Sequence, residues 1–162
     1  MAAAAPSTPA LFLREPELRR GMELLYFGHS HITRSTDQML AAKGLGRAHH
    51  RALYFVARKP DLTVSELLSL LAITKQSLGR VLNELTARGL VEVRPGERDR
   101  RQRLLRLTPE GAALEAALFD EIRQRMSAAY VAAGPDAVAG YWAVLEGMIP
   151  QSERSQVVSL RD

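Results

Sequence analysis

The pattern of hydrophobic and polar positions is clearest in the middle of the chain, where it predicts two short helices in succession. Thr63 and Glu66 have the spacing of a capping box, in which each side chain accepts a hydrogen bond from the other residue's backbone N–H. Three apolar positions then share one helical face: Leu67, Leu68 and Leu71. The pattern therefore predicts a helix of about two turns that begins after Thr63.

A second helix is predicted between a cap at Thr74 and an ending at Gly89. Apolar residues recur at i, i+3, i+4 and i+7, which gives this helix one buried stripe: Leu78, Val81, Leu82 and Leu85. The remaining positions carry side chains that suit base edges and phosphates: Lys75, Gln76, Ser77, Arg80 and Asn83. Gly89 has the place of a left-handed residue in a Schellman ending, with Leu85 and Leu90 spaced for its hydrophobic contact.

Beyond Gly89 the periodicity changes to the alternation of β-strands. Leu90–Arg94 and Arg103–Leu107 are the two predicted strands, and Pro95 and Gly96 begin the loop between them. Residues 97–102 form the tip of the hairpin. Two short helices followed by such a hairpin have the order of a winged helix-turn-helix, a module that binds duplex DNA.

The distribution of charge strengthens the expectation of a nucleic-acid partner. The formal net charge of +4, from 22 basic and 18 acidic residues, is weak evidence alone. Residues 94–106, however, hold six arginines against Glu97 and Asp99, a net +4 that equals the charge of the whole chain. A hairpin with scattered, solvated charge is the alternative, but six cations on one ribbon repel each other unless an anion binds there.

Helical spacing continues on both sides of this module. The predicted outer helices are Glu17–Ala42, with a bend or break at Gly28, Arg47–Arg58, a helix from Pro109 after a cap at Thr108 to about Ala133, and Asp136–Met148. The expected organisation is a disordered tail (1–10), an N-terminal dimerisation helix (11–45), the winged helix-turn-helix (46–109), C-terminal dimerisation helices (110–150) and a C-terminal tail (151–162).

The outer segments carry more apolar surface than the small central module is expected to cover. The residues concerned are Leu11, Phe12, Leu13, Tyr141, Trp142, Leu145 and Met148. They either cover the chain's own core or form the interface of a homodimer. DNA binding favours a two-fold dimer, because two recognition helices about 34 Å apart meet successive major grooves.

Composition excludes several other classes of function. The chain has no cysteine, so disulfides, thiol redox sensing and thiolate metal sites are excluded. No apolar run approaches the roughly 18 residues of a membrane span, and the first ten residues lack the basic region of a secretion signal, so a cytoplasmic location is expected. Motifs for nucleotide phosphates, dinucleotides, a nucleophile elbow or a zinc protease are missing, which leaves an enzyme unsupported and predicts no cofactor.

The segment Ile73–Gly111 resembles the MarR family of bacterial transcription regulators. The matching features are Arg80 in the second helix, the ending formed by Leu85, Gly89 and Leu90, the Asp99-x-Arg101 pair in the wing, and the LTPEG sequence that starts the next helix. The outer helices have the lengths and order of that family, so the resemblance covers roughly Pro16–Met148.

This resemblance implies an obligate homodimer with interlocked outer helices, a recognition helix in the major groove and a wing arginine in the adjacent minor groove. Asp99 corresponds to the carboxylate that orients Arg101 through a charge-assisted hydrogen bond. Arg98 or Arg100, nearer the tip, is the candidate for entering the minor groove. The predicted DNA-binding residues are Thr74, Lys75, Gln76, Ser77, Arg80, Asn83, Arg98, Asp99, Arg100 and Arg101.

The resemblance also implies a small effector, often an aromatic acid, held between the dimerisation helices and the DNA-binding module. Residues with polar tips that suit such a site are Tyr26, His29, His49, His50 and Tyr54. Ordinary packing is the alternative for each of them. Neither histidine pair has the i, i+4 spacing of metal ligands on one helix face, so a metal would need residues from both pairs to converge. Histidine also leaves a pH response open.

The sequence thus predicts a mainly α protein with a small β-hairpin wing, flanked by long dimerisation helices. The predicted function is a sequence-specific, double-stranded DNA-binding regulator, a ligand-responsive repressor that binds a pseudo-palindromic operator as a homodimer. A winged-helix module that binds protein instead of DNA is the alternative, and the arginine-rich wing argues against it.

Overall fold

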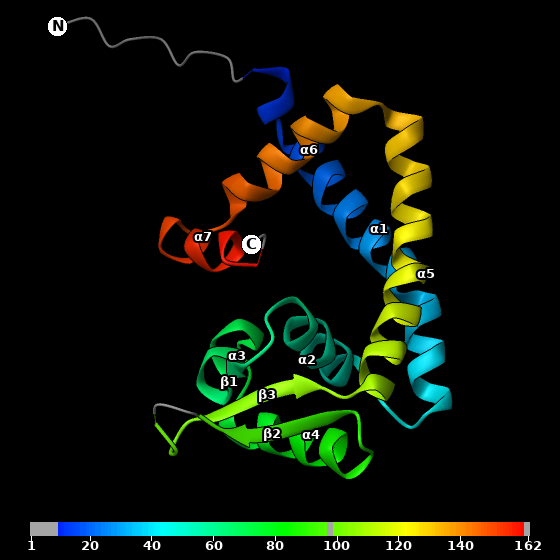
Figure 1. Ribbon diagram of the computed structural model, residues 1–162. Helices are drawn as coiled ribbons and strands as arrows, with labels where there is room; N and C mark the ends of the chain where they lie inside the picture. The colour runs from blue at the N-terminus through cyan, green and yellow to red at the C-terminus, as the bar shows by residue number, and fades with distance from the viewer. Residues whose placement is uncertain (1–9, 97–98, 161–162) are drawn as a thin grey trace, which may run out of the picture. The chain divides into compact units, whose positions relative to one another are not determined.

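The computed structural model describes residues 10–96 and 99–160, and within these ranges it is mainly helical with a small antiparallel sheet (Figure 1). The chain divides into two compact units, residues 1–34 and 35–162. The helical elements are η1 (Leu11–Leu13), α1 (Glu15–Ala42), α2 (Arg47–Arg58), α3 (Val64–Leu71), α4 (Lys75–Ala87), α5 (Pro109–Ala133), α6 (Pro135–Met148) and α7 (Gln151–Val158). The strands are β1 (Leu62–Thr63), β2 (Val91–Pro95) and β3 (Arg103–Leu107).

Helix α1 is continuous through Gly28, so a break predicted there is wrong. A glycine inside a helix costs only about 1 kcal/mol relative to alanine, which the rest of a long helix can offset. The helix passes from the first compact unit into the second, where Thr36 and Leu40 are buried. The predicted boundary of the DNA-binding module at residue 46 therefore falls inside the second unit, which already begins at residue 35.

The two central helices form for the local reasons that the sequence indicates. Thr63 Oγ1 accepts from the Glu66 N–H at 3.2 Å, and Glu66 Oε2 accepts from the Thr63 N–H at 2.8 Å, which confirms the capping box of α3. Thr74 caps α4 by accepting from the Ser77 N–H at 3.1 Å. Ala72 takes a left-handed conformation (φ 50°) at the turn between the helices. The predicted stripe of α4 is buried as expected: Leu78, Val81, Leu82 and Leu85.

The hairpin is part of a three-stranded sheet with the order β1-β3-β2. Strands β2 and β3 pair as predicted, with Val93 opposite Leu105. Strand β1, which the sequence analysis missed, pairs antiparallel with β3 and places Leu62 opposite the same Leu105. Two residues are too few to show a period, so β1 leaves no hydrophobic pattern. Its pairing joins the start of α3 to strand β3 of the wing.

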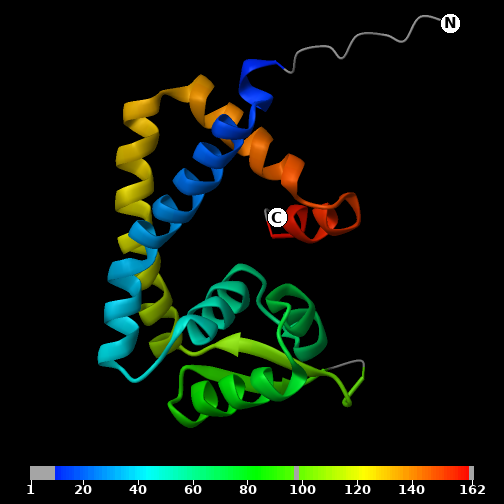
Figure 2. The ribbon, with the colours of Figure 1, turned by 180° about the vertical axis from the view of Figure 1, so that it is seen from behind.

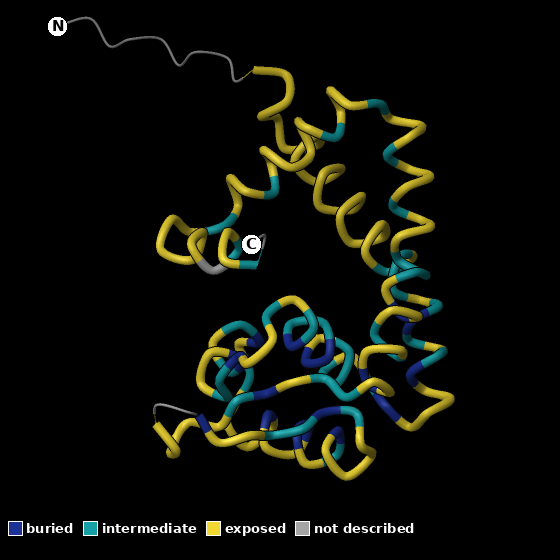
Figure 3. Tube along the Cα trace, viewed as in Figure 1, coloured by how far each residue is buried: buried dark blue, intermediate teal, exposed yellow. Residues whose placement is uncertain are grey.

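The core lies where α2, α3 and α4 meet the sheet and the first half of α5, as the buried positions in Figure 3 show. Viewed from behind in Figure 2, α4 runs along β2 while α2 contacts β3. The largest fully buried side chains in this cluster include Leu53, Leu67, Leu85, Leu105 and Leu118. Helix α4 is therefore held on its inner side mainly by apolar packing.

The end of α4 and the start of α5 meet at a tight backbone junction. Leu90 N–H donates to Leu85 O at 2.9 Å and Gly89 (φ 66°) N–H donates to Thr86 O at 3.0 Å, which confirms the predicted Schellman ending. Thr108 caps α5 and its N–H donates to Leu90 O at 3.2 Å. A Cβ atom on Gly111 would lie 1.9 Å from that same Leu90 oxygen, so only glycine fits this position.

Helical structure continues beyond the last helix that the sequence predicts. Helix α6 begins at Pro135, one residue before the expected start, and Pro150 is followed by α7 where a tail was expected. Pro150 stands at the N-cap of α7, a place where proline's missing N–H costs nothing. Along the described ranges, no helix combines the length and hydrophobicity needed to cross a bilayer.

Replacing Glu66 by glutamine is expected to lower stability at neutral pH but not in strong acid. Hydrogen bonds from Lys59 and Thr63 hold the pKa of the Glu66 carboxyl at about 2, below its usual 4.5. A group whose pKa is lowered by folding stabilises the fold above its unfolded pKa and loses this contribution as the pH falls through its folded pKa.

The difference in unfolding free energy between the two proteins should therefore shrink as the pH falls from about 4.5 to 2. At pH 7 it should be about 1 kcal/mol or less, since the Glu66 side chain is 45% exposed and solvent screens its interactions. Denaturant unfolding at several pH values measures it. A difference that stays constant over this range would contradict the assignment of the charge to the capping box.

Candidate nucleic-acid interface

The predicted DNA-contacting residues of α4 are all exposed. The hydroxyls of Thr74 and Ser77 lie 2.9 Å apart and serve the cap. The longer side chains are Lys75, Gln76, Arg80 and Asn83, and within the described ranges none of them has a hydrogen-bond or ion-pair partner. Exposed amide and guanidinium groups without a partner in the protein are available to bond base edges and phosphates.

The wing arginines divide into two groups. Arg94 pairs with Glu92 (Nη2 to Oε1 2.6 Å), and Arg106 pairs with Asp61, which lies at the end of the α2–β1 loop. Arg100 and Arg103 are exposed and have no such partner among the residues that the structure describes. Arg98, another predicted contact, lies outside the described residues. The cations available to an anion are therefore those of the hairpin tip and of the start of β3.

The resemblance implies a hydrogen bond from the Arg101 guanidinium to Asp99, but Asp99 bonds the Arg101 backbone instead. Asp99 Oδ1 accepts a hydrogen bond from the backbone N–H of Arg101 at 2.9 Å. The guanidinium Nε is 4.0 Å from the same oxygen, which is an ion-pair contact and not a hydrogen bond, and the Arg101 side chain is 96% exposed. An aspartate that bonds the backbone two residues on closes a tight turn. Asp99 thus shapes the loop and leaves the Arg101 side chain extended into solvent.

A cleft of about 470 Å³ lies between the start of α3, the start of α4 and the loop end of the wing. Three cations surround it, Lys75, Arg101 and Arg103, and its other lining residues are Thr63, Val64, Ser65, Asp99 and Gln102. Hydroxyl groups and clustered cations beside the beginning of a helix suit a phosphodiester. Sequence reasoning missed Arg103 and Ser65 because the pairing of β1 with β3, which brings α3 to the wing, was not visible to it.

The residues predicted to hold an effector are divided between the two compact units. His50 and Tyr54 lie one turn apart on α2, and the Tyr54 ring is 6.5 Å from Phe119 on α5. Burial lowers the pKa of His50, and the Asp37 carboxylate opposes this shift. Tyr26 and His29 are exposed and belong to the first compact unit. Within the described ranges, no three histidine, aspartate or glutamate side chains gather as a metal site.

His49 is used differently from the predicted effector contact. Its Nδ1 accepts from the Gly46 N–H at 3.0 Å, and its Nε2 lies 2.9 Å from Glu84 Oε2 on α4. Both ring nitrogens are therefore occupied by the protein itself. The ring links the beginning of α2 to α4, a role that sequence spacing could not reveal because Glu84 is 35 residues away.

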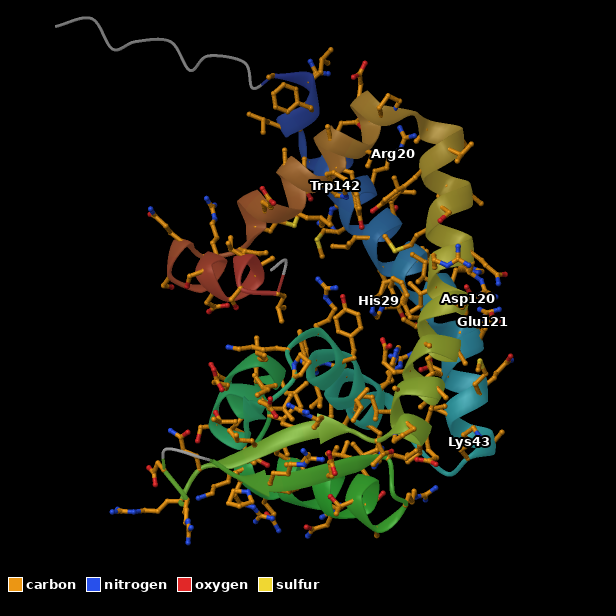
Figure 4. The ribbon with its side chains drawn as sticks, viewed as in Figure 1. Arg20, His29, Lys43, Asp120, Glu121 and Trp142 are labelled. Atoms are coloured by element: carbon orange, nitrogen blue, oxygen red, sulfur yellow. The ribbon has the colours of Figure 1, made fainter. Side chains whose placement is uncertain are left out.

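The residues predicted to form a dimer interface are largely exposed in the single chain. Phe12 is 72% exposed, and Leu11, Leu13, Tyr141, Trp142 and Met148 are also exposed, whereas Leu145 is half-buried. Trp142, labelled in Figure 4, donates from Nε1 to the Tyr130 hydroxyl at 3.1 Å. The rings of Tyr130, Tyr141 and Trp142 thus form an aromatic cluster at the α5–α6 corner.

Comparison with known proteins agrees with this geometry. The sequence model of the MarR family matches residues 43–102, the segment that contains α2, α3, α4 and most of the wing. The HTH-type transcriptional regulator PetP of Rhodobacter capsulatus is 49% identical over 152 residues, which cover 94% of this chain and 92% of PetP. The chain therefore belongs to the MarR family of winged helix-turn-helix transcription regulators, a class of DNA-binding proteins.

Solved structures share the fold. A mutant MarR from E. coli in complex with operator DNA matches with a TM-score of 0.62 and 23% identity, over 88% of this chain and 100% of that chain. BpsR of Bordetella bronchiseptica, whose DNA binding is regulated by 6-hydroxynicotinic acid, matches with a TM-score of 0.61 and 22% identity, over 80% of this chain and 98% of that chain. At these identities the likeness concerns the fold alone.

Proposed function

We propose that this protein is a repressor that binds a pseudo-palindromic operator as a homodimer and is released from it by a small effector. The observation that carries the proposal is the exposed, unpaired set of polar side chains on the first turns of α4, beside a cleft bordered by three cations. A helix that offers both amide and guanidinium groups can read base edges in the major groove.

The contacts sort into two kinds. Gln76 and Arg80 are the proposed base readers, because glutamine suits adenine and arginine suits guanine in the major groove. Lys75 and Arg103, which border the cleft at the loop end of the wing, are the proposed phosphate contacts. Arg100 and Arg101 are the proposed contacts in the minor groove. Phosphate contacts set the affinity and its salt dependence, whereas base contacts set the preferred sequence.

The homodimer is supported by the first compact unit. Within residues 10–34 no residue is buried, although this segment holds many large apolar side chains, among them Phe12, Leu18, Met22, Leu24 and Phe27. Exposed apolar surface on this scale is typical of an interface. A two-fold pair of chains would place two α4 helices about one helical turn of DNA apart, which matches successive major grooves.

The effector is supported by a comparison and by the chemistry of α2. BpsR shares this fold, and its DNA binding is regulated by 6-hydroxynicotinic acid, an aromatic acid. In this chain His50 and Tyr54 offer polar groups on one face of α2, next to the aromatic ring of Phe119. We infer that an aromatic acid would use these residues, since an apolar wall with a few polar groups suits such a ligand.

The test is a selection of bound duplexes from a random DNA pool, with the purified chain at near-physiological salt. An enriched inverted repeat with half-sites about one helical turn apart would support the proposal. Placing that repeat in a promoter and measuring transcription then tests repression. Weak, salt-sensitive binding to every duplex would contradict sequence specificity. No binding to DNA would favour the alternative, a winged helix that binds protein.

Replacing Gln76 by alanine is expected to change the preference at one base pair of the operator by roughly 1–3 kcal/mol and to leave the other positions unchanged. Arg80→Ala should act in the same way at a second position. The measurement is competition binding with a set of single-base variants of the operator. Arg94→Ala is the control, because Arg94 is paired with Glu92 and should not affect base preference. A loss that is uniform across all duplexes would make either residue a phosphate contact.

A further inference from the structure

The second half of the recognition helix is attached to the corner where α1 turns into α2. This corner comprises residues 43–49, and Lys43, labelled in Figure 4, lies where α1 ends. Glu84 lies in the last turn of α4 and Arg88 is the C-cap residue four positions later, so the two side chains lie on the same side of the helix. Both side chains form hydrogen bonds with this corner. Glu84 bonds the His49 ring, and the Arg88 guanidinium bonds backbone carbonyls at the end of α1.

The hydrogen bonds of His49 determine which ring nitrogen carries the proton. Nδ1 accepts from the Gly46 N–H, so it cannot itself be protonated while that bond exists. The proton is therefore on Nε2, which donates to the carboxylate of Glu84 at 2.9 Å. The His49 side chain is only 13% exposed, and a charge-assisted hydrogen bond in a partly desolvated place is directional and stronger than one in water.

Arg88 adds a second attachment one turn further along α4. Its guanidinium donates to the carbonyl of Lys43 and lies 3.4 Å from the carbonyl of Gly44. These carbonyls stand at the carboxyl end of α1, where a helix carries partial negative charge and a cation is favourable. Gly44 takes a left-handed conformation (φ 63°) there, and a Cβ on it would lie 3.4 Å from the guanidinium. The missing side chain of Gly44 therefore leaves space for the Arg88 guanidinium at this corner.

We propose that His49, Glu84 and Arg88 form a positioning clamp that sets the direction of α4 relative to the α1–α2 corner, and thereby the spacing at which a dimer reads two half-sites. The inference rests on the proposed binding of an inverted repeat by a homodimer. The buried stripe of α4 is apolar, and the hydrophobic effect that buries it is non-directional. The clamp supplies the directional contacts.

Geometry makes the direction of α4 important for spacing. Gln76, the proposed base reader in the first turn, lies eight residues before Glu84, a distance of about 12 Å at 1.5 Å per residue. A tilt of about 10° at the clamp would move that turn by about 2–3 Å, most of the 3.4 Å rise between base pairs. In a two-fold dimer both helices move together. A small change of angle at the corner is thus enough to change the preferred spacing by one base pair.

The test compares operator spacings. Duplexes carry the selected inverted repeat with its natural spacer, or with the spacer shortened or lengthened by one or two base pairs. The wild-type chain should lose about tenfold in affinity when the spacer changes by one base pair, and the Glu84→Ala, Arg88→Ala double variant should lose only about twofold. Glu84→Gln keeps an oxygen that accepts from His49 Nε2, so together with the intact Arg88 it should retain the wild-type discrimination.

Two further readouts separate positioning from stability. Single-base changes within a half-site should cost the same in wild type and variants, because the base readers are untouched. Asp120→Ala is the control: it removes a carboxylate that pairs with Arg123 on α5, far along the chain from the clamp (Figure 4), and should leave spacing discrimination unchanged. An equal loss of affinity at every spacing in the double variant overturns the clamp and leaves the proposed function intact. If the wild-type chain selects no inverted repeat, the proposed function fails and the clamp with it.

Discussion

Replacing Arg101 by alanine is expected to weaken operator binding by about tenfold to a hundredfold, with the fold intact. The Arg101 side chain is 96% exposed, and its guanidinium makes no hydrogen bond to Asp99, so it contributes little to folding. Its extended position at the hairpin suits insertion into a narrow minor groove, where the negative potential of DNA is strongest. The unfolding free energy should change by less than about 0.5 kcal/mol.

Two variants distinguish the specific contact from simple loss of charge. Arg123→Ala also removes one exposed arginine, but from α5, and should leave affinity close to wild type. Arg101→Lys keeps the charge without the planar fork, so its affinity should lie between those of the wild type and Arg101→Ala. Fluorescence anisotropy with the selected duplex at fixed salt measures these effects, and thermal unfolding checks the fold. Wild-type affinity in Arg101→Ala would show that the wing contacts DNA through other residues.

Replacing Gly111 by alanine is expected to lower the unfolding free energy by roughly 3 kcal/mol or more. The new Cβ would lie 1.9 Å from Leu90 O and 2.9 Å from Leu90 C, both backbone atoms that cannot turn away. Helix α5 would have to move from the end of α4, and the hydrogen bond from Thr108 N–H to Leu90 O would be lost with it. Denaturant unfolding measures the change.

Gly140→Ala in α6 is the matched control, because a Cβ on Gly140 meets no atom within 4 Å. That substitution should stabilise the helix by up to about 1 kcal/mol, since alanine is the better helix former. Equal stability of the Gly111→Ala variant and the wild type would mean that the α4–α5 junction relaxes without cost. The glycine of the LTPEG sequence would then need another explanation.

Sequence reasoning succeeded where a structure depends on neighbours along the chain. Thr63, Thr74 and Thr108 cap the helices that follow them, and Gly89 ends α4 in the left-handed conformation expected of it. Each of these features is decided within about five residues, so spacing alone reveals it. The buried stripe of α4 was likewise readable, because one helical period gives it.

Features that depend on distant partners were not readable. Arg106 pairs with Asp61, 45 residues away, so a carboxylate holds this wing arginine although it looked like the others in the sequence. His49 looked like an effector contact, but Glu84 occupies its ring. Strand β1 is too short to show a period and exists through its pairing with β3. The roles assigned to four groups of residues stay predictions: the base readers, the wing residues, the effector contacts and the dimer interface.

The buried face and the exposed face of α4 consist of different residues. The four buried leucine and valine positions hold the helix in place. Apart from the cap at its start and Glu84 and Arg88 at its far end, the polar positions that face solvent have no hydrogen-bond or ion-pair partner among the described residues. Under the proposed function, mutation at the outer positions is expected to change the recognised sequence without loss of folding. A gene duplicate of this protein would then have a short evolutionary path to a new set of target promoters, because the residues that set specificity are not those that hold the helix.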